Sequence, residues 1–401
     1  MGVHGPSSHS AVGSAGVTDS LRLSLDVSAV PANPAGAGQY TLGLAGALAE
    51  RTDVQLTLVS RSEDAERWER LAPNASVEAV APAHRPVRLA WEQTGLARRL
   101  RKLPVEVHHG PHYTMPEASR LPRVVTIHDL TYFDHPEWHR RSRVPFFRRA
   151  IRVAARHAEA LVCVSARTAE RLSEICPASG PVHVVPHGVD HQRFRPEAAE
   201  PGADEAALVG LGVNVPYVAF VGTLEPRKDV PTLVRAFDRM CAAHGGLSLV
   251  VAGGIGWGTG AVDRAIAEVR HPERIVRPGY VADAVVPALL RQAAAVAYPS
   301  LEEGFGLPAL EALACGAPLV TTTGSAMQEV VQGAAVLVAP GDVDGLAGAL
   351  DLLVRRDDGL SARRTRGLVV AARHNWAASA AGHLTAYRAA IARGKHSQEP
   401  D

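Results

Sequence analysis

Two adjacent carboxylates, followed by glycines and a proline, stand in the segment PSLEEGFGLPALEALACGAPLV, residues 299–320. Glu302 and Glu303 follow the apolar run AAVAYPS, and Pro308 suits the first turn of a helix because its missing N–H would be unpaired there. The pattern predicts a strand, a loop and a helix whose free N–H groups point at the loop. Carboxylates accept hydrogen bonds from sugar hydroxyls, and glycines let main-chain N–H groups approach a phosphate. The segment therefore predicts a site for hydroxyls and phosphate together.

A pair of cations stands at an equivalent place in VGTLEPRKD, residues 221–229, where Arg227 and Lys228 follow the apolar run YVAFVG. Taken alone, such a pair is more often exposed surface charge. Cations are nevertheless unusual at a helix start, because the helix dipole favours anions there, and an anionic ligand would resolve the conflict. Each contact with a unit charge about 4 Å away is worth roughly 4 kcal/mol at an effective dielectric near 20. Arg227 and Lys228 are therefore candidate phosphate contacts.

The bulk composition excludes several classes of partner. The 401 residues contain 42 Lys and Arg against 41 Asp and Glu, so no overall field attracts nucleic acid. The four cysteines are far apart and form no C-x-x-C pair, which favours reduced thiols over disulfides or a zinc site. The first twenty residues lack the pattern of a signal peptide, and no run approaches the roughly twenty apolar residues of a membrane span. We expect a soluble, cytoplasmic protein.

Short apolar runs alternate with helix-length segments along the chain, which favours parallel sheets covered on both faces. The expected strands lie within residues 21–30, 54–60, 105–110, 123–129, 160–165, 182–188, 217–222, 247–254, 274–280, 294–300, 317–322 and 335–340. The predicted organisation is a disordered N-terminus (1–20), a first Rossmann-like domain (21–195), a linker (196–214), a second Rossmann-like domain (215–375), a helix returning to the first domain (376–395) and a disordered tail (396–401). A ligand is expected where the carboxyl ends of the two sheets meet.

Glu303 and Glu311, with seven residues between them in EGFGLPALEALACGAPLVTT, resemble the E-x7-E signature of the retaining glycosyltransferases of family 4. Four further segments match in order: GAGQYTLGL resembles the family's N-terminal glycine loop, VTIHDLTYFDHPE its His-Asp segment, PHGVD its domain-closing turn and VGTLEPRKD its phosphate clamp. The resemblance implies an α/β protein with the GT-B fold, in which two Rossmann-like doubly wound parallel-sheet domains face each other across a cleft.

The same resemblance implies a nucleoside diphosphate sugar as donor, whose leaving group gathers negative charge as the glycosidic bond breaks. Arg227 and Lys228 would stabilise that charge, and Glu303 would contact the hydroxyls of the transferred sugar. Glu311 would bind the donor ribose. The other expected donor-binding residues are Gly36, Gly38, Phe305, Gly306 and Leu307.

His128 follows the strand RVVTI and by resemblance would lie beside the reacting face of the sugar, with Asp129 orienting its imidazole. A lone histidine after a strand is more often structural, which stays as the alternative. No residue stands out as a covalent nucleophile. The resemblance implies retention by a front-face route, in which the donor's own phosphate oxygen takes the acceptor proton. We expect no cofactor and no essential metal.

Three other patterns suggest different chemistry. Gly256, Gly258 and Ala261 form a loose dinucleotide-binding pattern, which leaves a nicotinamide oxidoreductase as a weaker alternative. Asp342 and Asp344 imitate a D-x-D metal site, but a helical segment follows, so helix capping is the favoured interpretation. Two sets of histidines lack carboxylate or thiol partners at the spacing of a metal site: His108, His109 and His112; His183, His187 and His191.

The donor and acceptor remain open. The segments HGPHYTMP, VTIHDLTYFDHPE and VGTLEPRKD are most like the mannosyltransferase branch, so GDP-mannose is the favoured donor and a UDP-sugar the alternative. A non-catalytic nucleotide-sugar-binding subunit is the rival from another class. The acceptor is expected to be a glycan, a lipid-linked molecule or a small molecule, with His112 and Tyr113 on its side of the cleft. Gln39, Asp229, His187 and Gln328 depart from the family pattern, and the first two make the donor site more negative.

The first domain also has two basic segments, residues 85–103 and 139–157. Leu96, Leu100 and Leu103 fall on one helical stripe among arginines. An amphipathic helix packed on its sheet is the simpler interpretation, and peripheral contact with an anionic membrane is the alternative.

Overall fold

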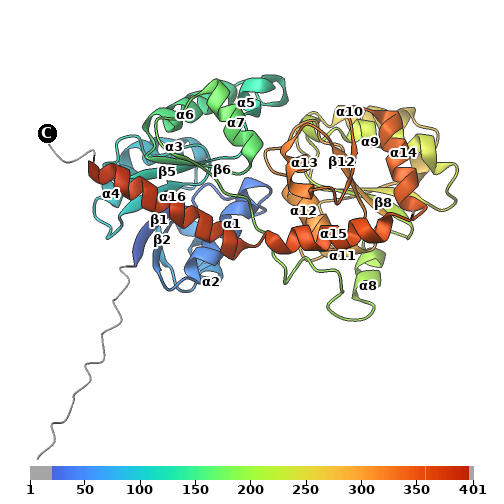
Figure 1. Ribbon diagram of the computed structural model, residues 1–401, viewed down its shortest axis with the longest axis horizontal. Coiled ribbons are helices and arrows are strands. Elements are labelled where there is room, and N and C mark those ends of the chain that lie inside the picture. Colours follow the sequence, from blue (N-terminus) through green and yellow to red (C-terminus); the bar gives the residue numbers. More distant parts are fainter. Residues whose placement is uncertain (1–19, 357, 397–401) are drawn as a thin grey trace, which may run out of the picture.

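The computed structural model describes residues 20–356 and 358–396, and folds them into two lobes, each a sheet with helices on both faces (Figure 1). The predicted disordered ends lie almost wholly outside the described residues. No helix in the described ranges is long and apolar enough to cross a membrane.

The first lobe has a seven-stranded parallel sheet in the order β3-β2-β1-β4-β5-β6-β7. Its strands are β1 (Leu21–Asp26), β2 (Val54–Arg61), β3 (Ser76–Ala81), β4 (Val107–Gly110), β5 (Arg123–Ile127), β6 (Ala160–Cys163) and β7 (Val182–Val184). Its helices are α1 (Ala37–Ala49), α2 (Ala65–Leu71), α3 (Arg85–Trp91), α4 (Ala97–Leu100), α5 (Thr131–Asp134), α6 (Val144–His157) and α7 (Ala166–Ile175). The strand order reverses between β1 and β4, which opens a crevice at their carboxyl ends.

The second lobe has a six-stranded parallel sheet in the order β10-β9-β8-β11-β12-β13. Its strands are β8 (Tyr217–Val221), β9 (Ser248–Ala252), β10 (Ile275–Gly279), β11 (Ala295–Tyr298), β12 (Leu319–Thr322) and β13 (Val336–Val338). The remaining helices are α8 (Ala203–Gly210), α9 (Val230–Cys241), α10 (Gly260–Glu268), α11 (Val286–Arg291), α12 (Leu307–Ala314), α13 (Ala326–Val331), α14 (Val343–Val354), α15 (Leu360–Arg373) and α16 (Trp376–His396). The reversal here falls between β8 and β11.

The helix α16 returns from the second lobe and lies along the first sheet beside α1 (Figure 1). Its Leu384 and Tyr387 are buried in the core of the first lobe. The chain thus crosses between the lobes twice, and the two crossings meet at a parallel bridge between Val189 and Asn375.

The stretch expected to be a plain linker, residues 196–214, contains α8. Asp204 on this helix is buried, and its Oδ1 accepts a hydrogen bond from Arg291 of α11 at 2.6 Å. The linker prediction was therefore incomplete, because a buried ion pair ties this stretch to the second lobe.

The leucine stripe of residues 85–103 packs inward. Leu96 and Leu100 are buried against Val59 and Val105, with Leu103 partly buried beside them. A short π-helical segment, Glu92–Leu96, joins α3 to α4. The stripe is therefore the amphipathic face of a helix packed on its sheet.

Candidate active site

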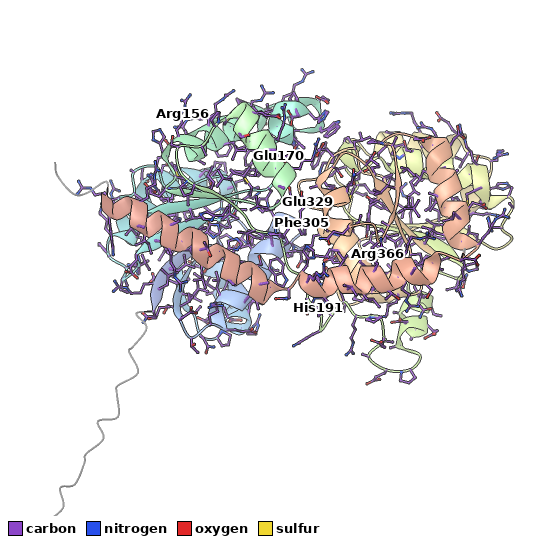
Figure 2. All side chains as sticks on the ribbon, viewed as in Figure 1. Arg156, Glu170, His191, Phe305, Glu329 and Arg366 are labelled. Carbon is purple, nitrogen blue, oxygen red and sulfur yellow. The ribbon has the colours of Figure 1, made fainter. Side chains whose placement is uncertain are left out.

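The carboxyl ends of the two sheets face a common cavity of about 330 Å³. The first lobe lines it with the loop after β1 (residues 35–37) and with residues that follow β4 and β5. The second lobe contributes the turn after β8, Trp257 and the loop after β11 (residues 303–308). Phe305 of that last loop lies between the lobes (Figure 2). The cleft thus forms where doubly wound sheets bind ligands.

Glu303 forms ion pairs with the two cations that line this cavity, Arg227 and Lys228. Its Oε2 accepts a hydrogen bond from Arg227 Nη1 at 2.6 Å, and its Oε1 accepts one from Lys228 Nζ. Arg227 Nε also donates to Glu225 at 3.0 Å. The cations follow β8 and Glu303 follows β11, and because these two strands are neighbours in a parallel sheet, their ends bring the groups together.

The ion pairs favour the charged forms of Glu303 and Arg227, whereas burial lowers the pKa of the Lys228 ammonium despite its contact with Glu303. Burial acts to raise the pKa of the Glu303 carboxyl, but Arg227 and Lys228 outweigh it and lower the pKa to about 2. Burial also opposes the charge of Arg227, yet Glu303 and Glu225 raise the pKa of its guanidinium above the ordinary value. Arg227 Nη2 and two of the three Lys228 ammonium protons make no hydrogen bond within the described part of the chain. These N–H groups can receive an anion.

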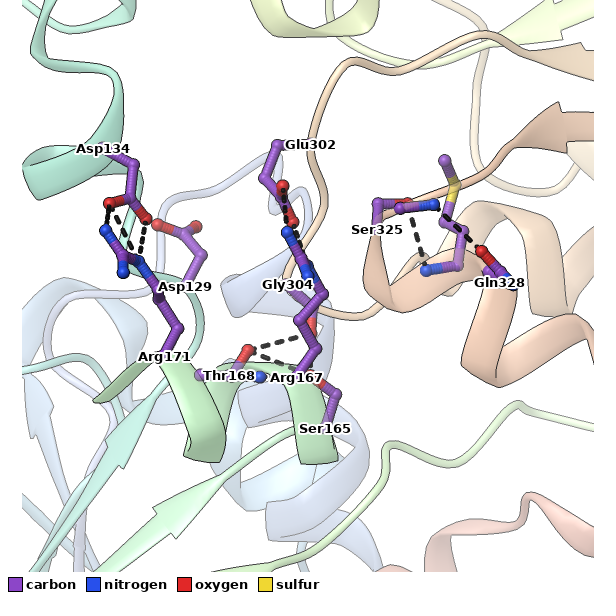
Figure 3. A network of polar contacts seen from close by, with 12 residues as sticks. Asp129, Asp134, Ser165, Arg167, Thr168, Arg171, Glu302, Gly304, Ser325 and Gln328 are labelled. Atoms are coloured by element: carbon purple, nitrogen blue, oxygen red, sulfur yellow. Dashed lines mark hydrogen bonds and ion pairs between the residues drawn. The ribbon is translucent and has the colours of Figure 1, made fainter. Parts of the chain in front are cut away.

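The loop that carries Glu303 is fixed from the opposite lobe. Gly304 lies so close to the His128 carbonyl that a side chain at position 304 would collide with it. The Gly304 carbonyl accepts hydrogen bonds from Ser165 Oγ at 2.7 Å and Thr168 Oγ1 at 3.3 Å, both at the start of α7 (Figure 3). The first lobe therefore sets the position of a loop in the second.

His128 lies in the cavity wall with a defined tautomer. Its Nε2 is 2.8 Å from the Pro111 carbonyl, and because a carbonyl only accepts, Nε2 carries the proton and Nδ1 is left as an acceptor. Burial lowers the pKa of this imidazole, so it is neutral at neutral pH. The sequence led us to expect Asp129 to orient this imidazole, but the ring is held by the Pro111 carbonyl. Asp129 Oδ1 instead accepts hydrogen bonds from the N–H and hydroxyl of Thr131, at 3.1 and 2.6 Å.

Glu311 lies on α12, behind the cavity-lining loop. Burial raises the pKa of its carboxyl to about 8, with Arg193 and Asp283 within electrostatic range. Asp283 Oδ2 also accepts a hydrogen bond from Gln39 Nε2 of α1 at 3.1 Å. Glu311 is thus close to a direct contact between the lobes.

Comparison with known proteins agrees with this arrangement. Residues 34–193 match the family model described as Glycosyltransferase Family 4, and residues 215–356 match the model described as Glycosyl transferases group 1. The chain belongs to glycosyltransferase family 4. The two matches fall on the two lobes, and the resemblance predicted from the sequence motifs is confirmed.

Curated relatives of this glycosyltransferase have names of different transferases. The O-antigen chain mannosyltransferase B of Escherichia coli is 28% identical over 317 residues, which cover 78% of this chain and 80% of that one. The D-inositol 3-phosphate glycosyltransferase of Nocardia farcinica is 35% identical over 244 residues, 58% of this chain and 53% of that one. The chain therefore spans only about half the length of the second relative.

Solved structures confirm the GT-B fold. A sucrose-phosphate synthase from Thermosynechococcus elongatus aligns with a TM-score of 0.75 at 19% identity, covering 93% of this chain and 99% of that one. The Anabaena protein Alr3699/HepE, solved with UDP and glucose, aligns with a TM-score of 0.73 at 18% identity, covering 91% and 98%.

Eight of the ten site residues expected for the glycosyltransferase line the one cavity: Gly36, His128, Arg227, Lys228, Glu303, Phe305, Gly306 and Leu307. Gly38 and Glu311 do not line it. Gly38 lies in the first turn of α1, where a side chain would collide with Pro34. A glycine is therefore needed there for the helix to pack against the preceding loop. This position does not fit the expected approach of Gly38 to a diphosphate.

Several cavity residues had no role in the sequence prediction. Tyr132 and His139 stack with their ring centroids 3.9 Å apart, and Trp257 Nε1 donates to the Trp138 carbonyl at 2.7 Å across the lobes. Tyr132 and Trp257 stand in motifs that the sequence singles out. Nothing in the sequence indicates that their loops meet.

The competing patterns have structural roles. Asp342 accepts a hydrogen bond from the Gly345 N–H at 2.9 Å and caps α14, which confirms the capping prediction. His108 and His109 are buried, and His109 Nε2 lies 2.8 Å from Thr126 Oγ1. In residues 20–356 and 358–396, no three His, Cys, Asp or Glu side chains gather as a metal site requires.

Proposed function

We propose that the protein is a retaining glycosyltransferase that moves a hexosyl group, mannosyl in the favoured case, from a nucleoside diphosphate sugar to an acceptor hydroxyl. The pairing of Arg227 and Lys228 with Glu303 in the cavity carries this proposal. The unused N–H groups of the two cations meet the charge that grows on the departing diphosphate. Because they are already in place, little reorganisation is needed as the bond breaks.

Glu303 and His128 would hold the transferred sugar. Each Glu303 oxygen uses one lone pair on a cation and keeps another for a sugar hydroxyl, and His128 Nδ1 accepts one more. Glu303 is committed to two cations, which makes it a weak nucleophile. This favours front-face retention, in which a phosphate oxygen of the donor takes the acceptor proton, without an essential metal.

The names of two relatives support the mannosyl assignment. One is the O-antigen chain mannosyltransferase B. The other is the MMP alpha-(1->4)-mannosyltransferase of Mycolicibacterium hassiacum, 32% identical over 254 residues, which cover 60% of this chain and 56% of that one. GDP-mannose is accordingly the proposed donor.

Ligand-dependent melting separates the candidate donors. We expect GDP and GDP-mannose to raise the melting temperature more than UDP and UDP-glucose, and NAD to have no effect. Purified protein should then hydrolyse or transfer labelled mannose, with the α-configuration of the donor retained in the product by NMR and with no loss of rate in EDTA. Nucleotide-sugar binding without any turnover would indicate a non-catalytic subunit, and no response to any nucleotide would overturn the proposal.

Contact with an anionic membrane is a subsidiary proposal. The leucine stripe is buried and cannot insert into a lipid surface. Membrane contact would therefore depend on the basic side chains of residues 85–103 and 139–157. Sedimentation with anionic vesicles should then be abolished by salt. Absence of binding at low salt would contradict it.

A further inference from the structure

A chain of buried hydrogen bonds joins α16 to α1, β4 and β5 in the core of the first lobe. The five side chains that form it are all fully buried. They are His383 and Tyr387 of α16, Tyr40 of α1, Thr126 of β5 and His109 of β4. None of them takes part in the transfer proposed above. Elements that are remote in the sequence are thus held together by polar groups as well as by apolar packing.

The direction of the chain follows from one carbonyl. His383 Nδ1 lies 2.7 Å from the Ser379 carbonyl, which can only accept, so Nδ1 carries the proton. Burial lowers the pKa of this imidazole to about 4, so at neutral pH the ring is uncharged and its Nε2 is an acceptor. The Tyr40 hydroxyl, 2.7 Å from Nε2, therefore donates to His383.

The remaining bonds follow in turn, because each hydroxyl has only one proton. The Tyr40 proton is used on His383, so the Thr126 hydroxyl donates to Tyr40 at 2.8 Å. His109 Nε2 then donates to Thr126 Oγ1 at 2.8 Å. Burial lowers the pKa of His109 well below its ordinary value, so its Nδ1 carries no proton and accepts from the Tyr387 hydroxyl at 2.9 Å. All the bonds point the same way, and each one polarises the next.

This chain lies beside the two groups that fix the tautomer of His128. Thr126 is two residues before His128, and His109 is two residues before Pro111, whose carbonyl accepts from His128 Nε2. The Tyr40 ring also lies edge-on to the His128 ring, with the ring centroids 5.1 Å apart. His128 lines the cavity, whereas none of the five chain residues does. The chain can therefore act on a substrate only through the residues of the cavity wall.

The ring of Tyr40 is packed where the chain crosses between the lobes. Its centroid lies 4.7 Å from that of His187 and 6.2 Å from that of Trp376, the first residue of α16. The Trp376 indole lies so close to Gly43 of α1 that a side chain at position 43 would collide with it. Along its length α16 contacts α1, β4 and β5 (Figure 1). Packing thus fixes the Tyr40 ring, and the hydrogen bonds fix its hydroxyl.

We propose that Tyr40 and His383 are positioning residues for His128, and that α16 holds this imidazole in place through them. The proposal deepens the function proposed above and rests on it, because it assigns the support of a group that would bind the transferred sugar. His128 Nδ1 would accept from a sugar hydroxyl, and a displacement of about 1 Å at such a contact can lower a rate about 100-fold. The helix that returns from the second lobe would then contribute to turnover without touching the substrate.

A pair of tyrosine substitutions tests the role of the Tyr40 hydroxyl. Tyr40→Phe keeps the ring but leaves His383 Nε2 and the Thr126 hydroxyl without their partner. We expect kcat to fall about 10-fold or more while the donor KM changes by less than about 2-fold. Tyr217→Phe is the matched control, because the equally buried Tyr217 hydroxyl donates to the Leu289 carbonyl in the second lobe at 2.8 Å. This control should lower the melting temperature by a similar amount and leave kcat unchanged.

Two substitutions of His383 separate its acceptor from its bulk. His383→Gln provides an oxygen that can accept from the Tyr40 hydroxyl, whereas His383→Leu provides no acceptor. We expect His383→Gln to keep kcat within about 2-fold of the wild type and His383→Leu to lose about as much kcat as Tyr40→Phe. Equal losses in the two His383 variants would contradict a role for the acceptor.

Nuclear magnetic resonance of nitrogen-labelled histidines tests the chain without catalysis. The wild type should show protected N–H signals from His109 Nε2, His128 Nε2 and His383 Nδ1. Tyr40→Phe should speed the exchange of the His128 proton with water about 10-fold or more, and Tyr217→Phe should not change it. The opposite tautomer at His109 or His383, or an unchanged His128 signal in Tyr40→Phe, would overturn the proposal.

The positioning role and the transferase function fail in different ways. Equal kcat in Tyr40→Phe and Tyr217→Phe would reject the positioning role and leave the transferase intact. Absence of turnover with every donor and acceptor, with the His128 signal still dependent on Tyr40, would instead reject the transferase assignment.

Discussion

At the scale of single residues, the site depends on ion pairs that leave some hydrogen-bond donors unused. Glu303 pairs with both Arg227 and Lys228, yet each cation keeps N–H groups that can bind an anion. The carboxylate therefore holds the cations in position before a donor arrives. Removal of one cation should affect turnover more than folding.

Arg227→Ala should lower kcat about 100-fold or more, because it removes a contact that tightens as the diphosphate gains charge. Steady-state transfer and circular dichroism measure the two properties. Arg277→Ala is the matched control, since Arg277 pairs with Asp263 on the exposed surface. Near-normal turnover of Arg227→Ala would remove this residue from the mechanism.

Glu311 predicts a pH effect on stability. Its pKa rises from an ordinary 4.5 to about 8 on folding, so the folded state binds this proton more tightly. The stabilisation is complete below about pH 4.5 and is lost as the pH rises towards 8. Glu311→Gln should therefore show a smaller fall in melting temperature between about pH 6 and pH 9 than the wild type. An unchanged fall would show that Glu311 titrates normally.

At the scale of elements, the start of α7 joins the lobes. Ser165 caps α7 by accepting from the Thr168 N–H at 3.1 Å while its own hydroxyl donates to Gly304 (Figure 3). Glu329 of α13 accepts from the Ala166 N–H at 3.0 Å, so a carboxylate of the second lobe meets a helix N-terminus of the first. These contacts hold the Glu303 loop in place.

Ser165→Ala should lose a helix cap, worth about 1 kcal/mol, and also the bond to Gly304. We expect a lower melting temperature together with a several-fold lower kcat. Ser325→Ala is the control, because Ser325 caps α13 through the Met327 N–H and donates to no residue of the first lobe. Equal losses of kcat in both variants would contradict a positioning role for Ser165.

At the scale of the whole molecule, buried histidines make the stability of the folded state depend on pH. Burial lowers the pKa of His108 and His112 to about 3 and that of His383 to about 4. The pKa values of His109, His128 and His187 are lowered as well. Below pH 6.5 the unfolded chain binds more protons than the folded one, so stability is complete above that value and falls as the pH drops. The raised pKa values of Glu92 and Glu311 act in the opposite sense.

The melting temperature should therefore fall steeply between about pH 7 and pH 5, where His108, His112 and His383 each cost about 2 kcal/mol. His383→Gln should reduce the slope, since glutamine can keep the hydrogen bond to the Tyr40 hydroxyl without titrating. His84 is exposed, so His84→Gln should leave the slope unchanged. Equal slopes in both variants would contradict the prediction.

The strands that the sequence predicted are those whose apolar runs are buried on both faces. Every one of the twelve expected segments contains a strand, whereas β3 went unpredicted. It lies at the sheet edge, is mostly half-exposed and carries Glu78, so it has no continuous apolar run. The buried Asp204 that anchors α8 was also missed, because its partner Arg291 is remote in sequence.

The sequence by itself determined two parallel-sheet domains and the loops that carry their chemistry, since burial on both sheet faces and helix starts leave patterns within about ten residues. Only the tertiary structure decided which groups meet. Glu303 pairs with Arg227 across 76 residues, and His128 takes its tautomer from the Pro111 carbonyl. These contacts depend on where strand ends and helix starts are placed in space, which no local pattern encodes.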